Sequence, residues 1–282
     1  DHRDLHLSLR RQRQMCIRDR LRRAQESAEK GRPYSEKMNN VILNLSSGIP
    51  DMSNAPKLLS GTGNEKVHLC VVMTSDRGLC GGLNVNLFKK VISEIATYQK
   101  ENIEVDLVLV GAKAVQFFKR LGGNVLATAT HLGDQPKVND LIGAIKIMLD
   151  SYNDEKIDKL LIAHNEFVST MSQKPEIKTL LPVGTLDDDS DSLQSHWDYI
   201  YEPDAIDLLD GVLMRYIESQ VYRGATENFA CEMAAKMVAM KSATDNAGDI
   251  IDKLQLVYNK ARQASITQEI SEIVGGAAAV SE

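Results

Sequence analysis

Residues 230–261 read ACEMAAKMVAMKSATDNAGDIIDKLQLVYNKA, and the apolar and small side chains in this stretch recur at alternating spacings of three and four. The recurring residues are Ala230, Met233, Met237, Met240, Thr244, Ala247, Ile251, Leu254, Tyr258 and Ala261. This heptad spacing keeps one face of a helix turned toward a partner helix. We therefore predict a long helix whose seam packs against another helix.

The predicted helix runs from Asp204 to about Gly275, because little in that range would interrupt it. No proline follows Pro203, and the glycines before Gly275 are isolated. At 1.5 Å per residue, about 70 residues would span on the order of 105 Å. A compact domain formed by a chain of this length is roughly 35–45 Å across. The helix is therefore expected to extend beyond any compact domain, as a shaft, an arm or a strut.

Residues 21–47 show a second heptad seam, with an unusual share of small side chains. Its members are Leu21, Ala24, Ala28, Gly31, Ser35, Met38, Ile42 and Leu45. Small residues let two helices approach closely. We predict that this N-terminal helix and part of the C-terminal helix, residues 204–282, form an antiparallel coiled coil. Residues 48–65, rich in Asn, Ser, Gly and Pro, are predicted to be a connector.

Between these helices, residues 66–203 alternate short β-branched runs with helical patterns. The predicted strands are Val67–Met73, Val105–Val110, Val125–Thr130 and Leu160–Ala163, with an edge strand at Glu176–Val183. The predicted helices are Val85–Gln99, Ala112–Leu121 and Val138–Tyr152. This alternation indicates a Rossmann-like α/β domain with a mainly parallel sheet, inserted between the two terminal helices.

Composition limits the classes of function. The chain has 282 residues, a net charge of −6 and 5% aromatic residues, which suits one sizeable domain with helical extensions. Its four cysteines form no CxxC pair, which favours a reducing compartment. The longest apolar run, near Val67–Met73, is too short to cross a bilayer, so no direct membrane span is expected.

A Gly-rich loop, Ser75–Asn84, follows the first predicted strand and precedes a helix, where α/β folds often bind phosphate. Its sequence is SDRGLCGGLN, which matches neither G-x-G-x-x-G nor the P-loop pattern. Three interpretations stay open: a nucleotide site, a tight turn whose glycines allow positive φ, and an exposed docking loop for another subunit. Cys80 in this loop has no nearby histidine to act as a base, so packing is its expected role.

Metal chemistry has little support in the sequence. The six histidines do not occur at metal-ligand spacing. Asp187, Asp189 and Asp191 alternate as in a calcium loop, but Ser192 and Asp198 replace the glycine and glutamate that such a loop needs. We predict no catalytic residue, no metal and no cofactor on this chain.

The end of the long helix combines polar and apolar side chains. Residues 262–269 read RQASITQE, and an apolar stripe follows the helix through Ile266, Ile270, Ile273 and Val274. An exposed stripe of this kind marks a surface for a partner, and the simpler alternative is a coiled-coil end.

At these residues the sequence resembles the gamma subunit of F-type, proton-translocating ATP synthases, and its compact length leads us to expect a bacterial one. The resemblance runs from about Leu21 to the C-terminus, and its most specific part is residues 258–270, YNKARQASITQEI. Other matching segments are residues 21–25, 75–84, 217–219, 227–228 and 243–247.

The resemblance implies a non-catalytic central-stalk rotor. Proton flow through the membrane ring would turn it, and ATP would be made or hydrolysed on the alpha/beta hexamer. The implied partners are the alpha, beta, epsilon and c-ring subunits, with no nucleic acid. The implied location is peripheral, at the cytoplasmic face of the bacterial inner membrane.

The resemblance also assigns two sets of residues. The set expected to meet the alpha/beta hexamer is Arg262, Gln263, Thr267 and Glu269. The set expected in a foot near the epsilon subunit and the membrane ring is Asp76, Arg77, Gly78, Cys80, Gly81, Gly82, Asn84, Tyr199, Tyr201 and Glu202.

Residues 1–20 depart from the family pattern and read DHRDLHLSLRRQRQMCIRDR. Our hypothesis is that this leader replaces the family's N-terminal shaft residues through a gene-assembly artefact. Residues 1–23 hold eight Arg and three Asp, so they carry +5 and the remainder −11. A basic arm on an acidic body could bind nucleic acid or anionic lipid. The two rival functions are therefore a nucleotide-binding α/β protein that uses residues 75–84 and a nucleic-acid-binding coiled-coil protein that uses the leader.

Overall fold

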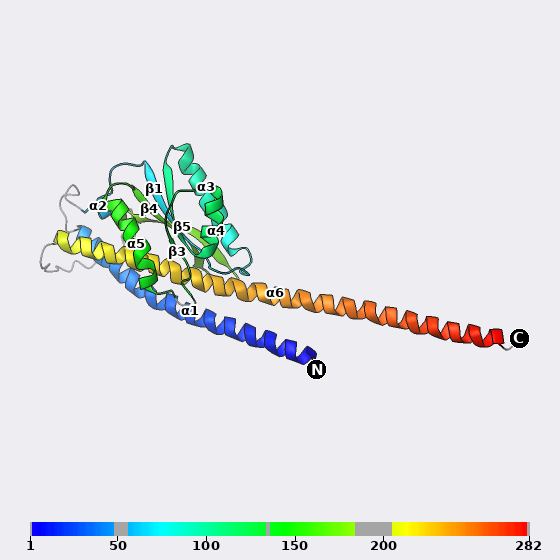
Figure 1. The fold of residues 1–282 in the computed structure, drawn as a ribbon. Coiled ribbons are helices and arrows are strands. Elements are labelled where there is room, and N and C mark those ends of the chain that lie inside the picture. The colour runs from blue at the N-terminus through cyan, green and yellow to red at the C-terminus, as the bar shows by residue number, and fades with distance from the viewer. Residues whose placement is uncertain (1, 48–55, 134–135, 184–204, 281–282) are drawn as a thin grey trace. The chain divides into compact units, whose positions relative to one another are not determined.

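The computed structural model describes residues 2–47, 56–133, 136–183 and 205–280. The chain divides into two compact units, residues 1–237 and 238–282, which we describe separately. The first unit holds all the strands and most of the helices among the described residues (Figure 1). The elements are α1 His2–Ser47, α2 Lys57–Ser60, β1 Val67–Met73, α3 Leu83–Lys100, β2 Glu104–Val110, α4 Ala112–Leu121, β3 Val125–Ala129, α5 Val138–Asn153, β4 Lys159–Phe167, β5 Gln173–Leu181 and α6 Ala205–Val280.

The sheet has five strands in the order β3-β2-β1-β4-β5. The pairs β1–β2, β1–β4 and β2–β3 are parallel, and β5 is antiparallel to β4, so the predicted mainly parallel sheet with an edge strand is confirmed. The prediction ended the fourth strand at Ala163, whereas β4 continues to Phe167. Residues 164–167 are mostly polar and lack the apolar pattern of a buried strand, but they pair with β5 in a hairpin.

Alternating side chains of β1 enter two different cores. Leu69, Val71 and Met73 pack in a cluster with residues of α1, α5 and α6. Cys70 and Val72 pack on the other face, with residues of α3 and α4. Figure 1 shows α3 and α4 together on one side of the strands and α5 on the other. A parallel sheet covered on both faces explains why β1 is apolar along nearly its whole length.

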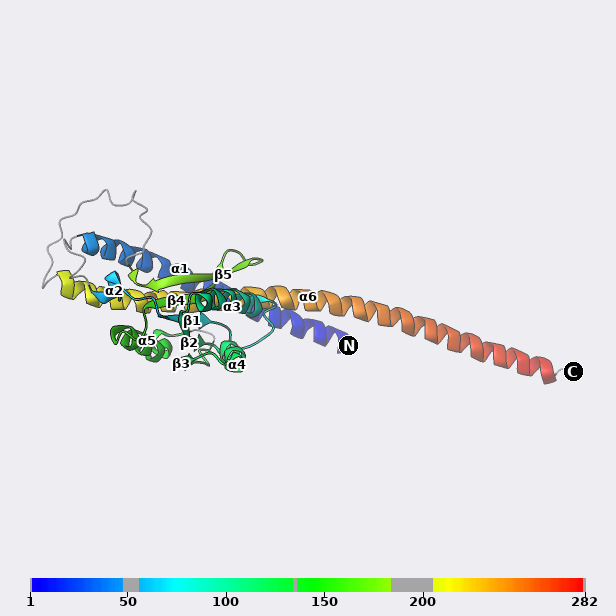
Figure 2. The ribbon, with the colours of Figure 1, turned by 90° about the horizontal axis from the view of Figure 1, so that it is seen from above.

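The predicted pairing of the two long helices is confirmed in the first unit. Leu21 of α1 packs with Met233 and Ala234 of α6. Further along α1, the Ser35 and Ser219 hydroxyls lie 3.3 Å apart. From the first of these contacts to the second, the residue number rises along α1 and falls along α6, so the helices are antiparallel. Figures 1 and 2 both show them side by side. Leu21 to Ser35 and Met233 to Ser219 each span two heptads, which is the regular repeat of a coiled coil.

The sequence pattern separated residues 1–20 from the helix predicted at Leu21. The structure has one helix, α1, from His2 to Ser47, which continues through that point and contains Pro33. The helix starts earlier than predicted because an Arg- and Leu-rich segment is a good helix former even without a heptad seam.

Replacing Met233 by lysine is expected to destabilise the first unit by about 3 kcal/mol, because the new ammonium group would enter a buried apolar cluster. Met233 is 3% exposed. Met240→Lys is the matched control, because Met240 is only half-buried and the same change should cost less than about 1 kcal/mol there. Urea unfolding followed by circular dichroism would measure both variants. Equal losses of stability at the two positions would contradict the pairing at Met233.

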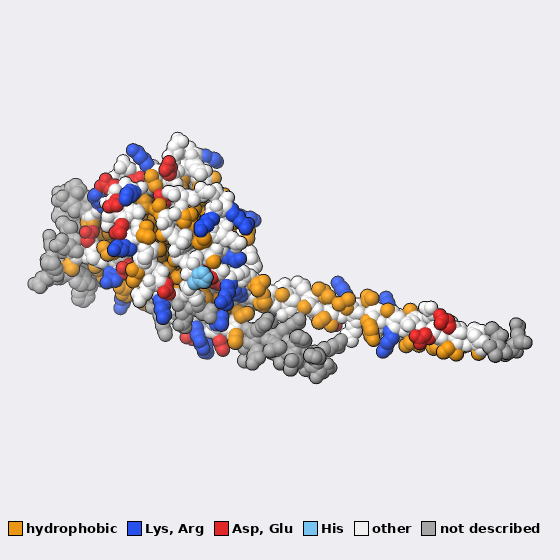
Figure 3. Space-filling view, viewed as in Figure 1, with side chains coloured by type: hydrophobic (Ala, Val, Ile, Leu, Met, Phe, Trp, Pro, Cys, Tyr) orange, Lys and Arg blue, Asp and Glu red, His pale blue; other side chains and the backbone are white. Residues whose placement is uncertain are grey.

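The second unit is helical over residues 238–280, the last part of α6. From Ile251 to Ala277 every described side chain is exposed, including the seam residues Ile251, Leu254 and Tyr258. Figure 3 shows hydrophobic side chains along this part of α6. The apolar seam that the sequence predicts is therefore present, and within the described chain this half of it has no covering partner.

Candidate functional site

The Gly-rich loop, residues 75–84, is held together by its own first and last residues. Asn84 donates from Nδ2 to Ser75 Oγ at 2.7 Å and to Cys80 Sγ at 3.5 Å. The Ser75 N–H donates to Asn84 Oδ1 at 3.4 Å, and its hydroxyl donates to the Arg77 carbonyl at 2.8 Å. Leu79 and Gly81 have φ values of 66° and 58°, so the chain turns back tightly between them.

Asp76 ties this loop to two neighbouring elements. Its Oδ1 accepts the Ala112 N–H at 2.9 Å, at the start of α4, and its Oδ2 accepts the Leu132 N–H at 3.1 Å, just after β3. Thr74 also links the end of β1 to its neighbours. Its hydroxyl accepts the Ala114 N–H of α4 at 3.0 Å and donates to the Val110 carbonyl of β2 at 3.0 Å. These bonds cap the N-terminus of α4, whereas the helix that follows the loop, α3, begins after Gly82 without a side-chain cap.

The crevice at the topological switch point, between the carboxyl ends of β1 and β4, is occupied by α6. Cys80 and Leu83 pack in one cluster with Cys231 and Ala235 of α6, and Phe167 contacts the same cluster. Ligands of open α/β sheets bind at this crevice. The geometry therefore favours the tight-turn interpretation of the loop over a nucleotide site, and it leaves the exposed Leu79 at the loop's tip for contact with a partner.

Asp76→Ala is expected to lower the free energy of unfolding by about 2 kcal/mol, because two backbone N–H groups lose a charged acceptor. Asp106→Ala is a suitable control, since Asp106 accepts one exposed hydrogen bond, from Asn124 at 2.7 Å. Surface changes of that kind cost about 0.5 kcal/mol or less. Chemical denaturation of the two variants tests this, and a loss at position 76 no larger than at position 106 would show that Asp76 does not tie these elements.

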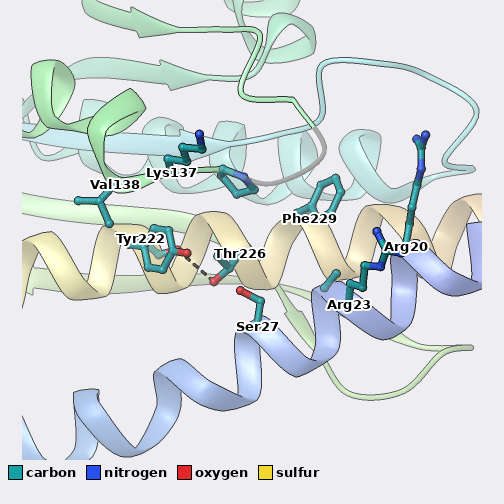
Figure 4. A pocket seen from close by; sticks show the side chains of 10 residues that line it. Arg20, Arg23, Ser27, Lys137, Val138, Tyr222, Thr226 and Phe229 are labelled. Carbon is teal, nitrogen blue, oxygen red and sulfur yellow. Dashed lines mark hydrogen bonds between the residues drawn. The ribbon is translucent and has the colours of Figure 1, made fainter.

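Several cavities lie near the contact of α1 with α6, and two of them also border the segment just before α5. The larger, about 780 Å³, is lined by Arg20, Arg23 and Ser27 of α1, Tyr222, Thr226 and Phe229 of α6, and the start of α5 (Figure 4). The smaller, about 280 Å³, borders Asp76 and Arg77. Among the described lining residues of the larger cavity there is no His, Cys, Asp or Glu to act as a general base.

Two of the three buried thiols, those of Cys70 and Cys231, are poor nucleophiles. Burial raises the pKa of Cys70 to about 12, and burial together with Glu227 and Glu166 raises the pKa of Cys231 further. Both therefore stay protonated at neutral pH, when only a thiolate would react. Across the described residues, no group of three or more His, Cys, Asp or Glu side chains could hold a metal ion.

The four residues predicted to meet the hexamer lie on α6 in the second unit, and all four are exposed. At about 100° per residue, Ile266, Ile270, Ile273 and Val274 fall within about 100° of one another around the helix. The four predicted polar residues, Arg262, Gln263, Thr267 and Glu269, lie on the same half of the helix as this stripe. Thr267 donates to the Gln263 carbonyl at 2.8 Å, and Ser265 donates to Glu269 Oε1 at 3.5 Å.

The residues predicted for the foot divide into two groups. Asp76, Arg77, Gly78, Cys80, Gly81, Gly82 and Asn84 lie together in the loop between β1 and α3. Tyr199, Tyr201 and Glu202, like the acidic segment at residues 187–191, lie outside the described residues. Of the first group, Asp76, Cys80 and Asn84 are engaged within the protein, and Arg77, Gly81 and Gly82 are exposed.

One polar cluster was not predicted as a site. His164 and Asn165 at the end of β4 meet Glu227 and Asn228 of α6, and all four are buried. Burial lowers the pKa of His164 to about 4, Lys178 and Arg223 act in the same direction, and Glu176 opposes them. The Glu227 carboxylate, 3.8 Å from His164 Nε2, favours the charged ring, but this distance is too long for a hydrogen bond and burial dominates. The imidazole is therefore neutral at pH 7.

An α/β domain set between paired terminal helices, together with an uncovered apolar helix, is typical of a subunit that is completed by partners. The family model described as ATP synthase matches residues 9–280, so the chain belongs to this family, that of the gamma subunit. The match begins before Leu21 and thus extends into the leader that the sequence pattern set apart.

Solved structures share the fold. A chain of the central stalk and c-ring of Tetrahymena thermophila mitochondrial ATP synthase matches with a TM-score of 0.59 and 20% identity, over 84% of this chain and 99% of that one. A rotor chain of Euglena gracilis mitochondrial ATP synthase matches with a TM-score of 0.53 and 20% identity, over 90% and 98%. At this identity the likeness concerns the fold.

Proposed function

We propose that this chain is the central-stalk rotor subunit of a bacterial ATP synthase and couples proton flow through a membrane ring to ATP synthesis or hydrolysis on an alpha/beta hexamer. Family membership and the exposed apolar stripe of the second unit support this function. A helix with a one-sided apolar stripe and polar groups beside it is asymmetric, so it presents different contacts to partners that are otherwise equivalent.

Coupling of proton flow to ATP synthesis through such contacts needs no chemical reaction on this chain. A shaft changes its partners only through the difference in contact free energy between their states. Arg262, Gln263, Thr267 and Glu269 would supply polar contacts to the hexamer, with Ile266 and Ile270 between them. The loop at 75–84, with Leu79 exposed at its tip, would contact the epsilon subunit or the ring.

The location follows from the same partners. No described helix has both the length and the apolar composition needed to cross a bilayer. The chain would therefore be held at the cytoplasmic face of the inner membrane by its contacts with the ring and the epsilon subunit. Catalysis would belong to the beta subunits, since Ser75, Asp76 and Asn84 of the loop at 75–84 bond within the protein.

Reconstitution tests the proposal. The chain is mixed with bacterial alpha and beta subunits, and the product is analysed by size-exclusion chromatography and ATPase assay. We expect a complex with three alpha, three beta and one copy of this chain, and hydrolysis well above that of alpha and beta alone. A chain that neither joins the complex nor changes hydrolysis would overturn the proposal. Replacing residues 1–20 by a family-like helix in parallel shows whether such a failure comes from the leader.

A further inference from the structure

The contact between α6 and the end of β4 contains a buried polar junction, formed by Asn165, Asn228 and Glu227. Asn165 Nδ2 donates to Asn228 Oδ1 at 2.8 Å, and the two residues are 0% and 3% exposed. One Glu227 oxygen, Oε1, accepts the Phe167 N–H at 3.3 Å. Cys231, one turn further along α6, donates from Sγ to the Asn165 carbonyl at 3.2 Å.

The preceding turn of α6 comes unusually close to the same strand. A Cβ atom added to Gly224 would lie 2.8 Å from Ile162 Cδ1 and 3.8 Å from His164 Cγ. Three successive turns of α6, at Gly224, at Glu227 with Asn228, and at Cys231, therefore contact β4 between Ile162 and Phe167. Two other buried polar side chains of α6 in the first unit bond within their own helix: Thr226 donates to the carbonyls of Tyr222 and Arg223, and Glu232 accepts from Lys236.

These two kinds of contact resist different motions. Apolar burial opposes separation of the helix from the sheet, but it is non-directional. A hydrogen bond weakens steeply with small changes of distance and angle, and a buried one has no water to replace it. A single buried Asn pair can fix the register of two packed helices in the same way. The junction is thus the part of this contact most sensitive to rotation or sliding of α6.

We propose that the Asn165–Asn228 hydrogen bond, with the Glu227 contact to Phe167, holds α6 in one register on β4 and is the junction through which torque passes between the α/β domain and the shaft helix. This inference rests on the proposed function. Asn165 and Asn228 are then positioning residues, which act through α6 and touch no substrate.

The test uses the complete membrane complex, reconstituted in vesicles with wild-type or variant chain. Asn165→Leu with Asn228→Leu removes both partners of the bond while it keeps the branched shape and the number of heavy atoms of each side chain. ATP hydrolysis and ATP-driven proton pumping are measured together, with the melting temperature of the chain. We expect hydrolysis within twofold of wild type and at least a threefold loss of protons pumped per ATP hydrolysed.

Ile162→Val is the matched control, because it loosens the apolar contact at Gly224 and leaves the hydrogen bonds in place. It should lower the melting temperature without changing the pumping ratio. If the double Leu variant does not fold, Asn228→Ala provides the same measurement, since alanine is favourable in a helix.

Two failures can be told apart. A variant that lacks the hydrogen bond yet pumps the wild-type number of protons per ATP overturns this inference alone. The same conclusion follows if Ile162→Val lowers the ratio as much as the double variant does. A wild-type chain that does not stimulate hydrolysis overturns the proposed function, and this inference with it.

Discussion

Gly111→Ala is expected to destabilise the first unit by about 4 kcal/mol or more, which is close to the whole stability of a marginally stable domain. Gly111 joins β2 to α4 and has a φ of 100°, a backbone conformation that residues with a side chain rarely adopt. A Cβ atom there would lie within 2.6 Å of the Thr74 carbonyl oxygen and hydroxyl. The expected result is loss of soluble expression or a large fall in the urea midpoint.

Two other glycines separate the backbone conformation from the clash. Gly122 ends α4 with a φ of 77° but has open space around it, so Gly122→Ala should cost about 1 kcal/mol. Gly143 lies inside α5, also with open space, and Gly143→Ala should stabilise by about 0.5–1 kcal/mol. If Gly111→Ala cost no more than Gly122→Ala, the close approach to Thr74 would not be essential to the fold.

The sheet and its covering helices were predictable because their side chains carry periodic patterns. Val67–Met73 and Ala112–Leu121 were predicted with the bounds that β1 and α4 have, since each is an unbroken run between turn residues. The end of β4 was not predictable in this way. His164, Asn165 and Glu166 are polar, and their strand conformation depends on pairing with β5, which a local pattern does not contain.

The candidate sites also differ in how far a local sequence pattern predicts them. The apolar stripe at Ile266–Val274 follows from helix periodicity alone, so its place on one face of the helix could be predicted. The junction at Asn165 and Asn228 joins residues that are 63 positions apart and share no motif. The sequence showed only Glu227-Asn228, two adjacent polar residues within a predicted helix. Their contact with β4 depends on burial, which the local sequence does not contain.

Ile266→Asp with Ile270→Asp is expected to reduce the stimulation of alpha/beta hydrolysis by at least tenfold. The two side chains are 47% and 56% exposed in the chain itself. Aspartate there meets water when the chain is alone, so its melting temperature should stay within about 2 °C, as for most surface substitutions. In the proposed hexamer the same carboxylates would be desolvated without a partner, which costs several kcal/mol, or more than tenfold in binding.

Gln268→Asp with Ser271→Asp is the matched control. Ser271 and Gln268 lie about 110° and about 170° from the centre of the stripe, at 100° per residue, so the same two charges enter the opposite side of the helix. Hydrolysis and complex formation by size-exclusion chromatography should stay within about threefold of wild type, because exposed polar substitutions at a rim cost little. Equal losses for the two pairs would mean that charge near the end of α6 matters and the apolar stripe does not. Unchanged stimulation by the Ile266 and Ile270 variant would remove the stripe as the surface that meets the hexamer.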